Sequence, residues 1–383
     1  MSPRISFHSH SVGGEEEAAV RRAIRQGRLA GHGPLGRRVE ASLARKLGVE
    51  RAFLTPSGTA ALELALMALG VGPGDEVILP SFNFVSDATA VLRQGARPVF
   101  ADVLPGTLGL DPQDVRRRLT RRTKAILLVH YGGVACDMAP FLAIRRERKL
   151  ALVEDAALAL GATWRGRPLG TIGDLGCFSF HATKQVTCGE GGALVSSRLR
   201  LARRIEVLRE KGTDRSSFLR GERDRYTWRD QGSSFLLSDL LAAVLEVQLR
   251  GEAGLRRKLL ALWRAYQREL GPLEEEGLLR LAHPSPDAGL NGHLFWLQLQ
   301  GPWKGRRSAV LKSLRRAGVS AAFHYLPLHS SPYGRSLRRG PRLVLKVTES
   351  AGRDLIRLPL HGRMNVKDAV AVAAKVMAVL RNH

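Results

Sequence analysis

Apolar runs and amphipathic patterns alternate along the first half of the chain. Short apolar runs bounded by turn residues predict buried strands, and these runs cover residues 76–80, 98–101, 124–130 and 150–154. Apolar residues three or four positions apart predict helices around them, at residues 36–47, 58–69, 84–94, 111–119 and 137–148. Because strands that alternate with helices of this length form crossover units, the pattern predicts an α/β domain with a mostly parallel sheet.

The second half of the chain predicts the edge of that sheet and then a smaller unit. Two further apolar runs, 175–180 and 192–196, predict strands with no long helix between them, which makes the sheet partly mixed. Beyond Leu245 the expected elements are a long helix, a strand and two more helices, at residues 236–270, 294–299, 306–317 and 366–381. We therefore expect an N-terminal arm and helix, a large domain and a small C-terminal α/β domain, which cover residues 1–30, 31–248 and 249–383.

Composition places the chain among ordinary globular proteins, with 44% apolar and 25% charged residues. No apolar run reaches the roughly 18–20 residues that a membrane span needs, and the N-terminal Met1–Arg4 is not followed by the apolar stretch of a secretory signal. Cys136, Cys177 and Cys188 show no CxxC pairing, so we expect reduced thiols and no metal site. The sequence thus predicts a cytoplasmic protein without a membrane partner.

The net charge of +25 has only a modest effect on the partners that we expect. Such a balance fits nucleic-acid binding or the attraction of an anionic substrate. The basic residues, however, are spread along the chain and occupy mostly the polar positions of helical patterns. We therefore favour a solvated, arginine-rich surface and expect no nucleic-acid partner.

Three segments carry candidate chemistry, and the first is the turn Ser57-Gly58-Thr59. It opens a predicted helix, where free backbone N–H groups and the positive end of the helix dipole can bind a phosphate. Taken alone the signal is weak, because Ser, Gly and Thr are also the usual residues that begin a helix.

The second segment is the pair Glu154-Asp155, at the end of a predicted strand. In open α/β sheets ligands bind beyond the carboxyl ends of the strands, and a carboxylate there can keep a pyridine nitrogen protonated. A solvated strand end is an equally good interpretation of this pair.

The third segment delivers Lys184 from an apolar strand into the glycine-rich turn 189–192. Partial desolvation lowers the pKa of a lysine toward the free amine that imine formation requires. Most single lysines are surface residues. The order of phosphate turn, acidic strand end and strand-borne lysine within one α/β domain favours a functional role for Lys184.

Further motifs surround these three segments and extend over nearly the whole chain. They are residues 74–81 (GDEVILPS), 129–136 (VHYGGVAC), 169–173 (LGTIG), 210–213 (EKGT), 226–230 (YTWRD) and 323–329 (FHYLPLH). In these motifs the chain resembles the DegT-type sugar-nucleotide aminotransferases. The resemblance implies the type I pyridoxal-phosphate (PLP) transferase fold, with a mostly parallel seven-stranded sheet and a smaller C-terminal α/β domain.

The resemblance also implies roles for individual residues. Lys184 would bind the cofactor covalently and move the proton between cofactor and sugar carbon, and Asp155 would pair with the pyridine nitrogen. Ser57, Gly58, Thr59 and Ser179 would hold the phosphate, while Phe84 and Ala157 would lie on the two faces of the ring. The expected substrate residues are His324, Tyr325, His329 and Arg229, although His324 and His329 are as well explained as hydrogen-bonded loop histidines. No metal is expected.

Three positions depart from the family pattern. The family usually has Gln in place of Leu158, where its amide is expected to hydrogen-bond the phenolic oxygen of the cofactor. Gln185 replaces an Asn, and one hypothesis is that its side chain reaches the space that Leu158 leaves without a polar group. Ser234 stands where many relatives place an Asn from the partner subunit on the phosphate.

The expected function is therefore a PLP-dependent transfer of an amino group from an amino acid, L-glutamate, to a TDP-4-keto-6-deoxyhexose. The expected product is a TDP-4-amino-4,6-dideoxyhexose, made at the interface of a homodimer with Arg229 and Ser234 near the partner's cofactor. One alternative is a 3-aminotransferase of keto sugar nucleotides in antibiotic deoxysugar synthesis. Another is a non-enzymatic regulator that binds nucleic acid, which the lack of an added helix-turn-helix segment disfavours.

Overall fold

The computed structural model describes residues 5–9, 12–337 and 340–381. Its main sheet has seven strands in the order β1-β9-β8-β5-β4-β2-β3. Their bounds are β1 Arg51–Thr55, β2 Glu76–Pro80, β3 Arg97–Ala101, β4 Thr123–Val129, β5 Ala151–Asp155, β8 Leu175–Ser179 and β9 Gly192–Ser196. Strands β3, β2, β4, β5 and β8 run parallel, and β9 is antiparallel to both of its neighbours. The predicted mostly parallel sheet is thus confirmed.

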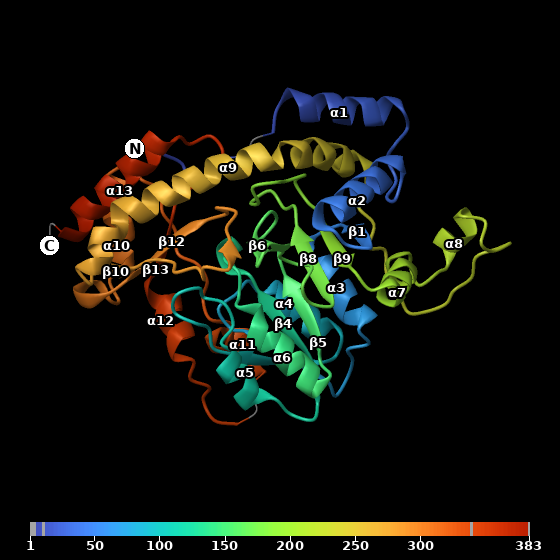
Figure 1. Ribbon diagram of the computed structural model, residues 1–383, viewed down its shortest axis with the longest axis horizontal. Coiled ribbons are helices and arrows are strands. Elements are labelled where there is room, and N and C mark those ends of the chain that lie inside the picture. Colours follow the sequence, from blue (N-terminus) through green and yellow to red (C-terminus); the bar gives the residue numbers. More distant parts are fainter. Residues whose placement is uncertain (1–4, 10–11, 338–339, 382–383) are drawn as a thin grey trace.

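Helices cover both faces of this sheet, which explains why its strands are apolar almost throughout. Along β2, Val77 and Leu79 belong to one buried cluster and Ile78 to another. The helices around the sheet are α2 Pro34–Leu47, α3 Gly58–Ala68, α4 Ser86–Arg93, α5 Pro112–Arg118, α6 Met138–Arg148 and α7 Leu199–Arg209. Helix α1 (Gly14–Arg25) packs on the start of the long helix α9 (Asp239–Glu275), above the rest of the large unit (Figure 1).

A second core lies around a small sheet in the order β10-β12-β13. Its strands are β10 Leu279–Arg280, β12 Phe295–Leu299 and β13 Leu355–Leu358, and its helices are α10 Arg307–Arg316, α12 Lys346–Asp354 and α13 Val366–Arg381. Helix α9 spans 37 residues and runs without interruption from the large unit to this one (Figure 1). The expected boundary between residues 248 and 249 therefore falls inside a helix, and the division of the chain remains a proposal.

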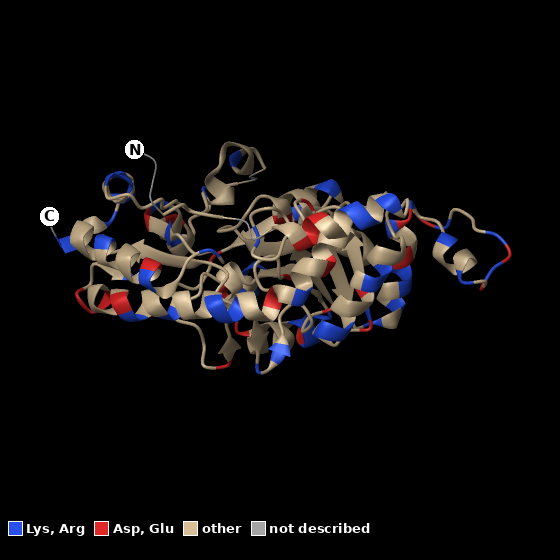
Figure 2. Cartoon of the chain, turned by 90° about the horizontal axis from the view of Figure 1, so that it is seen from above, with Lys and Arg blue, Asp and Glu red and all other residues tan. Residues whose placement is uncertain are grey.

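Smaller elements complete the described chain. Short strands β6 Thr163–Trp164, β7 Arg167–Pro168 and β11 Ala288–Gly289 form a third sheet. Helix α8 (Arg215–Leu219) lies on a segment that extends away from the body of the protein (Figure 1), and α11 (Pro332–Ser336) follows the 323–329 motif. Among the described residues, no helix combines the length and apolar character needed to cross a lipid bilayer. Figure 2 shows Lys and Arg distributed over most helices, as the sequence pattern predicts for a solvated surface.

Candidate active site

The carboxyl ends of four parallel strands bring the candidate residues to one edge of the main sheet. Asn83-Phe84 follow β2, and His130-Tyr131 follow β4. Ala156-Ala157 follow β5, and Phe180 follows β8. Because ligands of open α/β sheets bind at this edge, the loops that follow these strands form the candidate active site. Among the described residues, no group of His, Cys, Asp or Glu could hold a metal ion.

Lys184 lies in the turn that connects β8 to β9. Its backbone N–H donates to the carbonyl of His181 at 2.8 Å, and a bridge between His181 and Gly189 closes the turn. Gly189 has a φ of 89°, which favours glycine at this point. Burial lowers the pKa of the Lys184 amine to about 8; the charge of Asp155 opposes this shift and the charge of Arg357 adds to it. The amine is therefore neutral in an appreciable fraction of molecules near neutral pH.

Asp155, at the end of β5, forms a buried acid pair with Asp87 from the first turn of α4. The Ala157 N–H donates to Oδ1 of Asp155 at 2.8 Å, and the Asn83 amide donates to Oδ2 of Asp87. Asp87 is 1% exposed, and burial, then the charge of Asp155, raises its pKa well above its usual range. Burial also raises the pKa of Asp155, but less strongly. Since two neighbouring carboxyl groups cannot both ionise readily, Asp87 is the one that holds the shared proton.

Glu154 has a different role from its neighbour. Its two oxygens accept from the backbone N–H groups of Gly170, Ile172 and Gly173 at 2.8, 2.6 and 2.5 Å. The ring of His130 adds a hydrogen bond of 2.9 Å. Burial alone would raise the pKa of Glu154, but these hydrogen bonds hold it below its ordinary value. Glu154 thus fixes the 169–173 motif in place. Of the two neighbouring carboxylates, only Asp155 is available to bind a ligand.

The turn at residues 57–59 begins α3 beside Ser179. Ser57 is the N-cap, and its hydroxyl accepts from Ala60 N at 3.0 Å, so the structural role of this side chain is confirmed. A Cβ on Gly58 would lie 2.9 Å from Cβ of Ser179, which shows how closely the two segments approach. The N–H groups of Gly58 and Thr59 have no partner inside the helix. Together with the Ser179 hydroxyl they offer donors for a phosphate.

Aromatic side chains form one wall of the site. Tyr325 has its ring centroid 6.0 Å from Phe82, 6.1 Å from Phe84 and 6.1 Å from Tyr131. His324 stacks on Tyr325 at 3.5 Å, and its Nδ1 lies 2.8 Å from the Tyr131 hydroxyl. Burial, then the charge of Arg357, lowers the pKa of His324 to about 2, so this imidazole is neutral. Phe84 is 56% exposed and can cover a planar ligand from the open side.

The other expected substrate residues lie apart from this wall. Both ring nitrogens of His329 have partners, Ser81 at 2.7 Å and Glu349 at 3.3 Å, as the loop-histidine interpretation requires. Arg229 is exposed on the segment around α8, where its Nε donates to Asp214 at 2.6 Å. Ser234 is also exposed, and its backbone pairs with Glu210. In the described part of one chain, neither Arg229 nor Ser234 forms a hydrogen bond or ion pair with Lys184 or Asp155.

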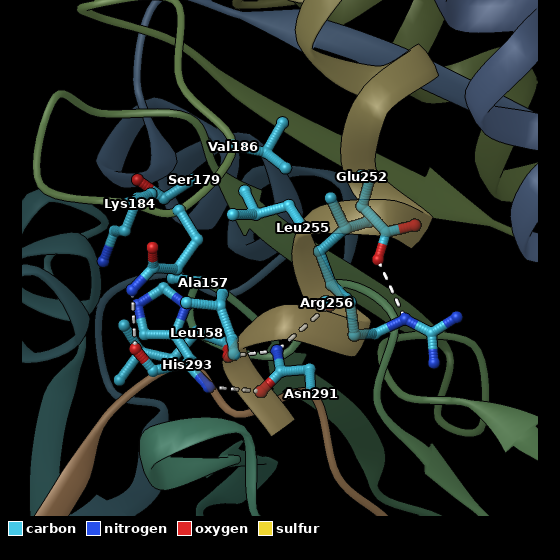
Figure 3. A pocket seen from close by; sticks show the side chains of 13 residues that line it. Ala157, Leu158, Ser179, Lys184, Val186, Glu252, Leu255, Arg256, Asn291 and His293 are labelled. Carbon is cyan, nitrogen blue, oxygen red and sulfur yellow. Dashed lines mark hydrogen bonds and ion pairs between the residues drawn. The ribbon is translucent and has the colours of Figure 1, made fainter. Parts of the chain in front are cut away.

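Leu158 and Gln185 lie close to Lys184 but do not replace one another. Figure 3 shows Leu158 beside His293 and Asn291, with the Asn291 amide donating to the Leu158 carbonyl at 2.8 Å. The Gln185 amide donates instead to the carbonyls of His293 and Leu360 at 3.0 and 3.1 Å. Its donors therefore tie the lysine turn to the small sheet, so the hypothesis that Gln185 compensates for Leu158 gains no support.

The residues at this edge fit pyridoxal phosphate. Three groups lie around one site with an aromatic wall. The Lys184 amine matches the aldehyde of the cofactor, the Asp155 carboxylate matches its ring nitrogen, and the donors at the start of α3 match its phosphate. Oδ1 of Asp87 is buried and has no hydrogen-bond partner among the described residues, as expected beside a site that takes a polar ligand.

Sequence reasoning missed Asp87, Asn83 and Arg357. Asn83 and Asp87 directly follow a predicted parallel strand, so the rule that pointed to Asp155 could have found them. Arg357 lies in the short strand β13, which the pattern did not predict, and a single charged residue in an apolar run gave no signal.

Comparison with known proteins agrees with this geometry. The model of the DegT/DnrJ/EryC1/StrS aminotransferase family matches residues 10–377. GDP-perosamine synthase from Caulobacter vibrioides is 34% identical over 386 residues, which cover 99% of this chain and 99% of that protein. Among solved structures, the aminotransferase TlmJ from Streptoalloteichus hindustanus is 33% identical, with a TM-score of 0.89 over 99% of both chains. DesV from S. venezuelae is 32% identical, also with a TM-score of 0.89 over 99% of both chains.

These findings and the site geometry agree on the reaction class. The match extends over nearly the whole chain, and it includes the sheet, the lysine turn and the small C-terminal unit. The enzymatic interpretation is therefore confirmed, and the cofactor is pyridoxal 5′-phosphate. The chain belongs to the DegT/DnrJ/EryC1/StrS aminotransferase family and has the type I PLP-transferase fold.

Proposed function

We propose that this aminotransferase moves an amino group from L-glutamate to the 4-keto carbon of a TDP-4-keto-6-deoxyhexose and so makes a TDP-4-amino-4,6-dideoxyhexose. The observation that carries the reaction class is the enclosed Lys184 amine with a pKa near 8, in electrostatic contact with the Asp155–Asp87 pair. The nucleotide assignment rests on the motifs that extend over nearly the whole chain, in which the sequence resembles the TDP-4-amino-4,6-dideoxygalactose transaminases. The net charge of +25 favours a diphosphate-bearing substrate.

The residues of this chain divide the work between binding and proton transfer. When bound, pyridoxal phosphate supplies an aldehyde for the amine and a ring that accepts electrons. Nζ of Lys184 removes the proton from the α-carbon of the donor, and in the second half of the reaction it returns a proton to the sugar carbon. Asp155 keeps its negative charge because Asp87 holds the shared proton, and this charge keeps the ring nitrogen protonated. The start of α3 and Ser179 bind the phosphate, while the wall around Tyr325 excludes water.

We also propose that the active site is completed in a homodimer. Arg229 and Ser234 are exposed and lie on or beside the segment that extends away from the body of the protein (Figure 1). A second copy of the chain could receive this segment and bring both side chains to its own phosphate seat. The aromatic and aliphatic side chains exposed there support this arrangement, since Trp228 is 79% and Leu219 59% exposed.

Two alternatives keep the fold and change the substrate. The 34% identity to a GDP-perosamine synthase favours a GDP-linked keto sugar as a second candidate. A 3-aminotransferase of keto sugar nucleotides is the other. Both keep Lys184, Asp155 and the phosphate seat in the same roles, so only the acceptor distinguishes them from the main proposal.

An absorbance spectrum tests the first half of the reaction. The protein loaded with pyridoxal phosphate should show a near-visible band that shifts when L-glutamate is added. Lys184→Ala should lose or alter this band, whereas Lys312→Ala, an exposed lysine on α10, should behave like the unmodified protein. A band that does not respond to any amino acid would contradict the proposal.

The second half of the reaction identifies the acceptor. The aminated enzyme is offered TDP-4-keto-6-deoxyglucose, its GDP-linked counterpart and a 3-keto sugar nucleotide in parallel. The proposal expects the original band to return with the TDP-4-keto sugar first, and magnetic resonance of the product gives the position and configuration of the new amine. Preferred turnover of another acceptor would replace the main proposal with one of the alternatives.

A further inference from the structure

Among the described residues, Arg357 is a partly buried cation without a carboxylate partner. It lies on β13, where its backbone pairs with Ala322 on one side and with Trp296 of β12 on the other. Its Nε is buried and has no hydrogen-bond partner, and among the described residues no carboxylate lies within ion-pair distance of its guanidinium. The deeply buried Arg209, in contrast, pairs with Glu40 at 2.6 Å. A charge that is held partly out of water with a buried, unpartnered Nε is costly, so its presence calls for an anion that is not part of the protein.

The contacts of Arg357 hold its guanidinium in place without neutralising it. Nη1 lies 3.2 Å from Nε2 of His324, and the guanidinium carbon lies 4.9 Å from the centre of the Phe7 ring. Because the Arg357 Nη1–H can only donate, Nε2 of His324 accepts, and Nδ1 carries the proton toward the Tyr131 hydroxyl at 2.8 Å. An imidazole and an aromatic ring orient the side chain, and the remaining N–H groups are left for a ligand.

Arg357 belongs to the same site as Lys184. Its charge lowers the pKa values of Lys184, His293 and His324, so all three lie within its electrostatic reach. Gln185, the neighbour of Lys184, donates to the carbonyl of Leu360, three residues after Arg357. The lysine turn is thereby fixed to the end of the strand that carries the arginine.

The anion must therefore sit close to the atom that reacts at Lys184. In an amino acid, the α-carboxylate is bonded directly to the carbon from which Lys184 removes a proton. In a 4-keto sugar nucleotide the diphosphate is attached across the sugar ring from the reacting carbon. A planar guanidinium also matches a carboxylate through two parallel hydrogen bonds. We propose that Arg357 binds the α-carboxylate of the amino donor and is the residue that selects amino acids over simple amines; this inference rests on the proposed function.

The test measures donor and nucleotide affinity separately in Arg357→Gln. The half-saturating concentration of L-glutamate is taken from the rate of the absorbance change in the PLP-loaded enzyme. The affinity for TDP and GDP, used as probes of the sugar-nucleotide side, is measured by calorimetry. Loss of a charged hydrogen-bond pair should raise the half-saturating glutamate concentration roughly 10- to 100-fold, and nucleotide affinity should stay unchanged.

Two further variants serve as controls. Arg363→Gln removes an exposed arginine just beyond β13 and should match the unmodified enzyme in both assays. Arg357→Lys keeps the charge but loses the two parallel hydrogen bonds. Its half-saturating glutamate concentration should therefore lie between those of the unmodified enzyme and Arg357→Gln. Melting curves of all variants establish that the fold is retained, and 4-aminobutyrate, which lacks the α-carboxylate, should react equally well or poorly with and without Arg357.

Each other outcome overturns the inference. A fall in nucleotide affinity with unchanged glutamate kinetics assigns Arg357 to the diphosphate. Unchanged values for both ligands leave it without a ligand role, and an equal loss of both points to a general disturbance of the site. If the unmodified PLP-loaded enzyme reacts with no amino acid, the proposed function itself fails and the inference fails with it.

Discussion

Replacing Asp87 by Asn tests the shared proton, because it changes how stability depends on pH. Asp87 is 1% exposed, and in the native state burial and the charge of Asp155 raise its pKa above the unfolded value of about 3.9. A group of this kind contributes stability below its unfolded pKa, and that stability is lost as the pH rises through the folded pKa. Each pH unit crossed in this window costs the native protein about 1.4 kcal/mol.

The free energy of unfolding of Asp87→Asn should not fall with pH in this way. Its amide is neutral like the protonated carboxyl beside Asp155, and its oxygen can accept from the Asn83 amide. At about pH 4, near the unfolded pKa, the two proteins should therefore differ by no more than about 1 kcal/mol in free energy of unfolding. With each further pH unit before Asp87 ionises, the variant should gain about 1.4 kcal/mol relative to the unmodified protein.

Urea unfolding of the cofactor-free proteins at several pH values measures this difference. Asp224→Asn, an exposed carboxyl on the segment after α8, is the matched control and should follow the unmodified protein at every pH. The infrared carbonyl band of a protonated carboxylic acid should also be present in the unmodified protein and absent from Asp87→Asn. Unfolding free energies that remain parallel from about pH 5 to about pH 8 would refute the shared proton.

Further predictions concern Glu154, Lys184, Leu158 and the proposed homodimer. Glu154→Gln should lower the free energy of unfolding by about 3–5 kcal/mol in urea titrations, because it disturbs a buried set of four hydrogen bonds. Since the pKa of Lys184 is lowered to about 8, the rate at which pyridoxal phosphate loads the cofactor-free protein should rise with pH through that value. Leu158→Gln should shift the absorbance maximum of the loaded enzyme and lower its stability by about 1–3 kcal/mol. Mixing Lys184→Ala with Ser234→Tyr, each inactive alone, should restore activity in mixed dimers, and no recovery would contradict a shared site.

The sequence predicted the main sheet well because burial on both faces leaves a strong apolar signal. Strands β4, β5 and β9 begin and end within a residue or two of their expected bounds. Strand β1 at the antiparallel edge was missed, since five residues next to a Pro-containing turn carry little pattern. Strand β13 was missed because Arg357 interrupts its apolar run.

The site was predictable only where one residue could be recognised from its own segment. Asp155 ends one strongly apolar strand and Lys184 lies in the turn after another, so their place at the sheet edge followed from topology. The proton on Asp87 and the isolation of Arg357 depend on partners 68 and 33 positions away in sequence, namely Asp155 and His324. No local pattern contains such information, because burial and the lack of a counter-ion arise only when distant segments meet.

The long helix α9 affects how the two cores can move relative to each other. The helix passes Gly251 and Gly254 where it leaves the large unit, and a Cβ on Gly251 would meet nothing within 4 Å. Glycine stabilises a helix by about 1 kcal/mol less than alanine does, so this turn is the most compliant part of a stiff rod. Any movement of one core relative to the other would therefore bend this helix rather than swing on a loose linker. A helix bent at this turn would return elastically to one resting angle, which a flexible linker would not do.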